Sequence, residues 1–125
     1  MHKSRLAGFI IDCNTGDLDA AAAFWAGALG YGLPVESADD PKYRNLDTGP
    51  NGLHVEVQKV DHPSRVHLDI ETDDIEAEVL RLEALGAKRF HKGPRWWVME
   101  APTGQRFCVV RTHGGDFAEH ANSWE

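Results

Sequence analysis

Apolar and polar side chains alternate through residues 65–70, and this period of two predicts a β-strand with two unlike faces. His67 and Asp69 lie on the polar face. The apolar face carries Val66, Leu68 and Ile70. The segment therefore predicts a sheet that packs on one side and carries chemically capable groups on the other.

A helix is predicted directly after this strand, because apolar residues recur at helical spacing through residues 75–86. Its apolar stripe consists of Ile75, Val79, Leu82 and Leu85. One of the three residues Thr-Asp-Asp at positions 72–74 can cap its N-terminus, and Gly86 can end it. Packing of the stripe on the apolar face of the strand would leave His67 on the other side of the sheet.

The remaining elements follow from the same patterns and from turn signals at glycine and proline. An alanine-rich helix is predicted over residues 18–29, with a cap at Asp17 and with Phe24 and Trp25 as its bulky packing residues. Gly30 should end this helix. Strands are predicted at residues 7–13, 33–36, 43–46, 53–60, 87–91, 96–100 and 106–111.

The order strand, helix, strand, strand, strand occurs twice, at about residues 6–60 and 64–111. Two turn and cap segments recur at offsets of 72 − 15 = 57 and 101 − 49 = 52 residues: 15–20 with 72–77, and 49–52 with 101–104. The alternative interpretation is chance similarity of turn and cap residues. Because order and turns repeat together, we interpret the chain as two related βαβββ modules.

The sequence thus predicts an α+β fold in which the two modules pair into a curved, cup-shaped mixed sheet with the helices on its outer face. Residues 1–125 form a single domain in this interpretation. Residues 112–125 form a tail outside both modules, and Phe117 and Trp124 predict that it packs against the rest of the chain.

The two offsets match residues of one module to residues of the other. The matched residues place one side chain from each of four strands at a common point in the cup. These residues are Ile10, Glu56, His67 and Cys108. The same strand faces also carry Asp12, His54, Gln58, Asp69, Arg106 and Val110. The cup is therefore the predicted location of any chemistry.

Composition and charge narrow the classes of function. The chain has 13 basic and 20 acidic residues and a net charge of −7, which argues against binding to nucleic acid or to an anionic membrane. No apolar run approaches about 18 residues, and the N-terminus has no apolar signal segment. Cys13 and Cys108 fall on opposite faces of their strands, which predicts free thiols and a cytoplasmic location.

Several segments occur in an order that is typical of one superfamily. They are Phe24-Trp25, 28–31 (Ala-Leu-Gly-Tyr), 65–69 (Arg-Val-His-Leu-Asp), 85–87 (Leu-Gly-Ala) and 101–110 (Ala-Pro-Thr-Gly-Gln-Arg-Phe-Cys-Val-Val). With these segments the chain resembles the glyoxalase/bleomycin-resistance/dioxygenase group, the vicinal oxygen chelate superfamily. It is most similar to the small glyoxalase-like proteins of bacteria. The resemblance covers nearly the whole chain and implies the paired-module fold, which hosts many reactions.

The resemblance implies that His, Glu or Gln at the four cup positions would hold one divalent ion. His67 fits the family's histidine, and Glu56 fits its mid-chain carboxylate, with Gln58 as an alternative alignment. Ile10 stands at the first-strand ligand position and Cys108 at the position of the last-strand glutamate. The ion would be Zn²⁺, Ni²⁺, Mn²⁺ or Fe²⁺, and a thiolate ligand would favour Zn²⁺.

Each of these residues also has a simpler interpretation. His67 can hydrogen-bond a neighbour, Glu56 can pair with Arg106, and Cys108 can be a small buried apolar residue. The adjacent residues Trp96 and Trp97 should face opposite sides of the sheet, so that one of them meets the helices and the other meets the cup.

Three functions remain open from the sequence. The first is a metal-assisted lyase or isomerase acting on a small oxygenated substrate, in which His67 and Glu56 hold the ion. Asp12 or Asp69 would move the proton, and Asp12 can also replace the ligand that Ile10 does not supply.

The second function is metal-free binding or sequestration of a small molecule, such as a drug or a metabolite. Residues assigned to the ligand are Trp97, Trp96, Cys108, Arg106, Gln58 and His54. The third is a mainly structural or partner-binding role with a vestigial cup, which a cup filled by side chains would favour. A homodimer is compatible with all three, whereas nucleic acid and membrane are not expected partners.

Overall fold

The structure is a computed structural model that describes residues 1–33, 41–50 and 52–125. Its strands are β1 (His2–Cys13), β2 (Tyr43–Leu46), β3 (His54–Lys59), β4 (Arg65–Thr72), β5 (Lys88–Lys92), β6 (Trp96–Glu100), β7 (Arg106–Arg111) and β8 (Asn122–Trp124). Its helices are α1 (Leu18–Leu29), α2 (Ile75–Ala84) and α3 (Phe117–His120). No helix in the described ranges is long and apolar enough to cross a membrane.

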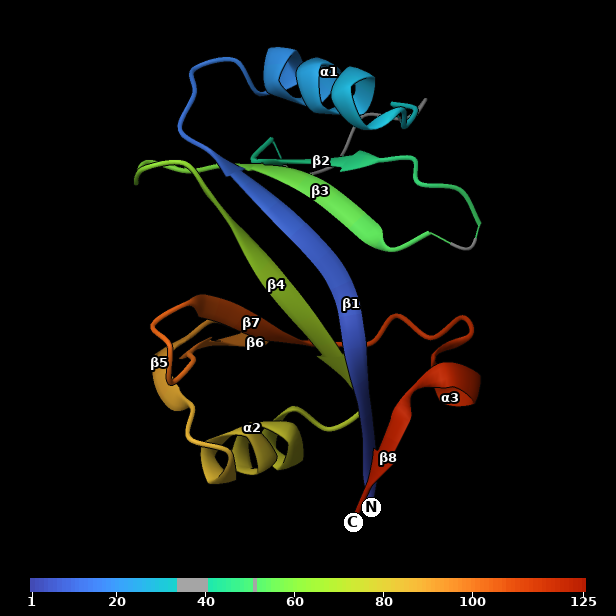
Figure 1. Cartoon of the computed structure of the whole chain (residues 1–125), viewed down its shortest axis with the longest axis vertical. Helices are drawn as coiled ribbons and strands as arrows, with labels where there is room; N and C mark the ends of the chain where they lie inside the picture. The colour runs from blue at the N-terminus through green and yellow to red at the C-terminus, as the bar shows by residue number, and fades with distance from the viewer. Residues whose placement is uncertain (34–40, 51) are drawn as a thin grey trace. The chain divides into compact units, whose positions relative to one another are not determined.

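The eight strands form a mixed sheet in the order β2-β3-β1-β4-β7-β6-β5, with β8 added to β1 (Figure 1). The pairs β1/β3 and β4/β7 are parallel, whereas β2/β3, β5/β6 and β6/β7 are antiparallel. In each predicted module the last strand therefore lies beside the first strand and runs parallel to it: β3 beside β1, and β7 beside β4. The predicted α+β class and mixed sheet are confirmed, and the division into two modules stays a prediction.

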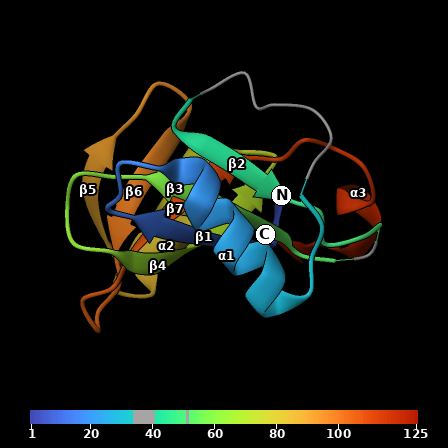
Figure 2. The same ribbon diagram turned by 90° about the horizontal axis from the view of Figure 1, so that it is seen from above.

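The chain forms two compact units, one of residues 8–67 and one of residues 1–7 with 68–125. In the first unit α1 lies against β2 and β3 (Figures 1 and 2). Its buried residues Leu18, Ala22 and Ala26 follow one another at helical spacing and form a core with the odd-numbered residues of β1 and β3.

Phe24 is not a packing residue of α1, contrary to the prediction. Its side chain is 63% exposed, whereas Trp25 packs at the edge of the core. The helix instead approaches the sheet through the two small residues Ala22 and Ala26, which allow close contact. The large size of Phe24 suggested the wrong face of α1. Helical spacing from Leu18 decides which side chains point at the sheet.

In the second unit α2 packs on the sheet through Val79 and Leu82, which contact Met99 and Val109. Ile70 joins this cluster as predicted. The same prediction is wrong for the other two apolar residues of β4, because Val66 and Leu68 are 57% and 44% exposed. Helix α2 has ten residues, about 15 Å, and its contacts are with β5, β6 and β7.

The helix caps follow the predicted chemistry. Asp17 accepts a hydrogen bond from the Ala20 backbone N–H at 3.1 Å, and Asp74 accepts one from Ala77 at 3.1 Å. Asp74 is therefore the cap among the three candidates at residues 72–74. Gly30 ends α1 in the left-handed conformation, with φ of 74°.

The C-terminal tail packs down, as Phe117 and Trp124 predicted. Phe117 is 4% exposed, and β8 pairs with the first residues of β1. This pairing explains why β1 begins at His2 rather than at residue 7. Its polar residues gave no strand signal, and their partner lies more than 100 residues along the chain.

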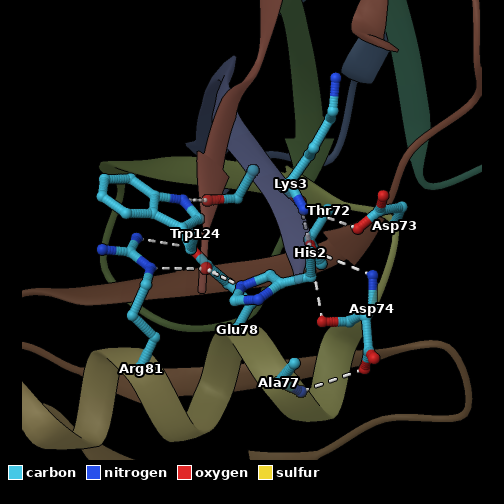
Figure 3. A network of polar contacts seen from close by, with 10 residues as sticks. His2, Lys3, Thr72, Asp73, Asp74, Ala77, Glu78, Arg81 and Trp124 are labelled. Atoms are coloured by element: carbon cyan, nitrogen blue, oxygen red, sulfur yellow. Dashed lines mark hydrogen bonds and ion pairs between the residues drawn. The ribbon is translucent and has the colours of Figure 1, made fainter.

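A polar network fastens this N-terminal strand to α2 (Figure 3). Glu78 is fully buried and accepts hydrogen bonds from His2 Nε2 at 2.8 Å and from both Arg81 Nε and Nη2 at 2.8 Å. The guanidinium of Arg81 lies 4.0 Å from the ring centre of Trp124. The buried carboxylate thus joins β1 to α2, and Arg81 extends the network to β8.

Strands predicted at residues 43–46, 53–60, 96–100 and 106–111 are confirmed within one residue at each end. The strand predicted at 33–36 falls largely outside the described residues, and Leu33 itself is in no strand.

Candidate functional site

Strand β4 carries two of the candidate site residues on one face. His67 and Asp69 are separated by one residue, so the strand pleat turns both side chains to the same side. Asp69 is the register partner of Cys108 on the parallel strand β7. The three side chains are half-buried, and each offers one atom that could bind a metal ion. We refer to this imidazole, carboxylate and thiol together as the donor group.

His67 contacts the carboxylate of Asp12 within the unit of residues 8–67. Its Nδ1 lies 2.8 Å from Oδ2 of Asp12, which is 3% exposed. Arg65 Nε lies 3.8 Å from the same oxygen. Oδ1 of Asp12 is buried and has no hydrogen-bond partner among the described residues. The sequence predicts Asp12 as a proton carrier or ligand, whereas its contact with His67 depends on tertiary structure.

Glu56 and Gln58 lie on the polar face of β3. Glu56 is half-buried, pairs in register with Ile10, and has its Oε1 3.6 Å from Nε2 of His54. Gln58 pairs in register with Asp12 and donates a hydrogen bond to the Tyr43 hydroxyl at 3.1 Å.

The predicted pairing of Glu56 with Arg106 is wrong. Arg106 Nε donates to Glu100 Oε2 at 2.9 Å, and its guanidinium lies 3.4 Å from the ring centre of Phe90. Strands β3 and β7 are not neighbours in the sheet, so the two residues do not form a cross-strand pair.

The registers also change how the two halves correspond. Asp12 and Asp69 are equivalent by the offset of 57, and their register partners are Gln58 and Cys108. Under this offset Cys108 corresponds to Gln58, whereas the offset of 52 pairs Cys108 with Glu56. The offset of 52 came from turn residues, and turns do not fix the register of the strands that follow them.

The two tryptophans lie on opposite faces of β6, as predicted. Trp97 packs against the cluster of Val79 and Leu82, and the guanidinium of Arg89 lies 5.0 Å from its ring centre. It is therefore on the helix side and away from the donor group. Trp96, which the strand pleat turns the other way, is half-buried on the face of Cys108.

Both cysteines are free thiols, as predicted. Burial raises the pKa of the Cys13 thiol, and the charge of Asp12 raises it further. Cys13 is thereby kept in the unreactive thiol form. Cys108 is more exposed and belongs to the donor group.

The sequence predicts a proton-transfer role for Asp69. The structure places Asp69 in register with Cys108, so that it is also a possible metal ligand. The alternation of β4 already put it beside His67. Its neighbour Cys108 became evident only from the parallel register.

The model of a glyoxalase-like domain family matches residues 8–110. The chain belongs to this glyoxalase-like domain family. The match covers every strand from the second half of β1 to nearly the end of β7, and it includes the whole donor group. No curated protein sequence matches the glyoxalase-like chain.

Solved structures similar to this glyoxalase-like protein support the fold. A hypothetical protein from Bacillus halodurans C-125 is 15% identical, with 90% of this chain and 96% of that chain covered and a TM-score of 0.63. A glyoxalase/bleomycin resistance protein/dioxygenase superfamily member from Vibrio splendidus 12B01 is 18% identical, covering 87% and 99%, with a TM-score of 0.56.

A third similar structure is the Mn(II)-bound glyoxalase from Novosphingobium aromaticivorans. It is 21% identical over 89% of this chain and 40% of that chain, with a TM-score of 0.59. At these identities the three structures show a shared fold.

The donor set of the glyoxalase-like chain fits a divalent metal ion by its chemistry. One nitrogen, one oxygen and one sulfur ligand are supplied by His67, Asp69 and Cys108. Three protein ligands with a remaining open position are typical of catalytic Zn²⁺ sites, and thiolate favours Zn²⁺ over the harder Mn²⁺.

Proposed function

We propose that this glyoxalase-like protein is a metal-assisted lyase or isomerase that acts on a small oxygenated substrate. His67, Asp69 and Cys108 would hold one divalent ion, and Zn²⁺ is the ion that their donor atoms favour. The observation that carries the proposal is the register of Asp69 with Cys108 on β4 and β7, with His67 two residues before Asp69 on the same face of β4. When bound, such an ion polarises a substrate oxygen and stabilises negative charge that develops on it.

Proton transfer falls to a carboxylate outside the donor group. Glu56 is half-buried on the polar face of β3, and its neighbour Gln58 is paired with Asp12. We assign the proton to Glu56 because Asp69 is used as a ligand in this proposal and Asp12 is bonded to His67. This differs from the interpretation in which Glu56 is itself a ligand.

Metal titration tests the proposal directly. Purified protein should bind one Zn²⁺ per chain in calorimetry, and Co²⁺ should give a thiolate charge-transfer band. H67Q, D69N and C108S should each lower Zn²⁺ affinity by at least about tenfold. H62Q is the matched control, because His62 hydrogen-bonds the Pro63 carbonyl outside the donor group. Absence of binding, or affinity that none of the three variants changes, contradicts the proposal.

One observation favours metal-free binding as a second candidate. Ile10 stands where the family's metal enzymes place a first-strand ligand, and this buried apolar side chain cannot coordinate a metal ion. A planar or cationic molecule could then contact Trp96, and the net charge of −7 would favour a cation. Quenching of tryptophan fluorescence in wild type that W96F abolishes and W97F preserves would support this candidate.

The partner and the cellular location of the protein are part of the same proposal. A small molecule is the proposed partner, and a reducing, cytoplasmic compartment fits the free thiols of Cys13 and Cys108. A homodimer stays a prediction, which light scattering on the purified protein would decide.

A further inference from the structure

We infer that Asp12 is a positioning residue that fixes the ring orientation and the tautomer of His67. The effect on metal binding rests on the proposed function, in which His67 is a metal ligand. Asp12 would touch neither metal nor substrate. It would act through the imidazole alone.

The contact itself is short and protected from water. Nδ1 of His67 and Oδ2 of Asp12 are 2.8 Å apart, and Asp12 is 3% exposed. Both residues belong to the unit of residues 8–67. A hydrogen bond to a buried carboxylate is stronger than one to water, so it restrains the imidazole ring in one orientation.

The chemistry of the carboxylate decides the tautomer. An ionised carboxylate only accepts hydrogen bonds, so the hydrogen of this contact belongs to Nδ1 of His67. In the neutral imidazole the lone pair then resides on Nε2, which becomes the ligand atom. Ligating histidines in proteins commonly have such a carboxylate on the other ring nitrogen, and it raises the basicity of the ligand.

The surroundings of Asp12 favour positioning over ligation. Oδ2 already has two partners, since Arg65 Nε lies 3.8 Å from it in addition to His67. Oδ1 is buried without a hydrogen-bond partner among the described residues. A buried carboxylate with one oxygen unsatisfied is costly, and such a cost is typical of a residue retained for its contact rather than for stability.

Nitrogen-15 NMR of the histidine side chains tests the inference without measuring activity. In metal-free and in Zn²⁺-loaded wild type, His67 should show a protonated Nδ1 whose hydrogen exchanges slowly with solvent, and H67Q assigns the signal. His62 provides an internal reference, because its Nδ1 lies 2.8 Å from a carbonyl oxygen that can only accept. In D12A the slow Nδ1 hydrogen of His67 should disappear while the His62 signal stays unchanged.

Zn²⁺ affinity provides the second measurement. D12A should lower it by about 10- to 100-fold, and the Co²⁺-thiolate band should persist because Cys108 is untouched. D12N, which keeps the shape and one acceptor oxygen, should recover part of the affinity. Circular dichroism of each variant confirms that the fold is intact.

The outcomes separate the two proposals. An unprotonated Nδ1 in folded wild type, or a slow Nδ1 hydrogen that survives in D12A, overturns the positioning role. A slow, Asp12-dependent hydrogen in a protein that binds no metal supports positioning and contradicts the proposed function. Metal binding that D12A leaves unchanged contradicts positioning alone.

Discussion

The indole Nε1 of Trp124 donates a hydrogen bond to the hydroxyl of Ser4 at 2.9 Å, so the last strand of the chain is fastened to the first. The same indole ring lies under the guanidinium of Arg81, which binds the buried carboxylate of Glu78. In the second unit these contacts therefore hold the N-terminal strand, the C-terminal strand and α2 together.

Replacement of Trp124 should weaken the contacts between these three elements. W124F removes the indole donor and part of the cation–π contact, so we expect the free energy of unfolding in urea to fall by about 2 kcal/mol. F24L is the control, because Phe24 is 63% exposed and should change stability by less than about 0.5 kcal/mol. In a double-mutant cycle with S4A, a coupling energy near zero would show that the hydrogen bond does not contribute.

Glu78 should be more important for stability than any exposed acid on the same helix. E78Q leaves Arg81 and His2 beside a neutral amide, and loss of one partner from a buried ion pair costs about 3 kcal/mol. E83Q, on the exposed face of α2, should cost less than about 1 kcal/mol. Equal midpoints of urea unfolding for the two variants would contradict this ranking.

The same carboxylate predicts how stability depends on acid pH. Burial alone raises the pKa of Glu78, but hydrogen bonds from Arg81, His2 and Ser4 outweigh it and leave the pKa below the usual value of a glutamate. Because the folded pKa is the lower one, its contribution is present above about pH 4.5 and is lost as the pH falls through the folded pKa. E78Q should therefore lose less stability than wild type in the same acid range, as measured by thermal unfolding.

Gly8 is required by a close approach of two strands. A Cβ built on Gly8 would lie 1.7 Å from the backbone oxygen of His54, its register partner on β3. G8A should therefore destabilise the protein by at least about 2 kcal/mol. G27A should instead stabilise it by about 0.5–1 kcal/mol, since Gly27 lies in α1 with nothing within 4 Å of its Cβ. Melting temperatures that shift in the same direction would refute this contrast.

The two cysteines should react with alkylating reagents at different rates. Cys13 is 8% exposed and burial raises its pKa, so it should react only after unfolding, whereas half-buried Cys108 should react in the native protein. Zn²⁺ should protect Cys108 if the proposed site is correct. Mass spectrometry after a short pulse of iodoacetamide distinguishes the two thiols, and rapid labelling of Cys13 in folded protein would be the contrary result.

The sequence by itself determined the features that depend on near neighbours. The alternation of β4 put His67 and Asp69 on one face, and the cap at Asp17, a cap within residues 72–74 and the end at Gly30 followed from local backbone chemistry. Each of these depends on residues within about four positions of one another, where the backbone period fixes direction. The family resemblance rested on the same local segments.

Only the tertiary structure decided which side chains meet. The contact of Asp12 with His67 and the pairing of Asp69 with Cys108 depend on strand register, which turn residues do not fix. The pairing of β8 with β1 joins residues about 120 positions apart and left no local pattern. Such contacts are selected by packing of the whole sheet and its helices, because a shift of register would move every buried side chain at once.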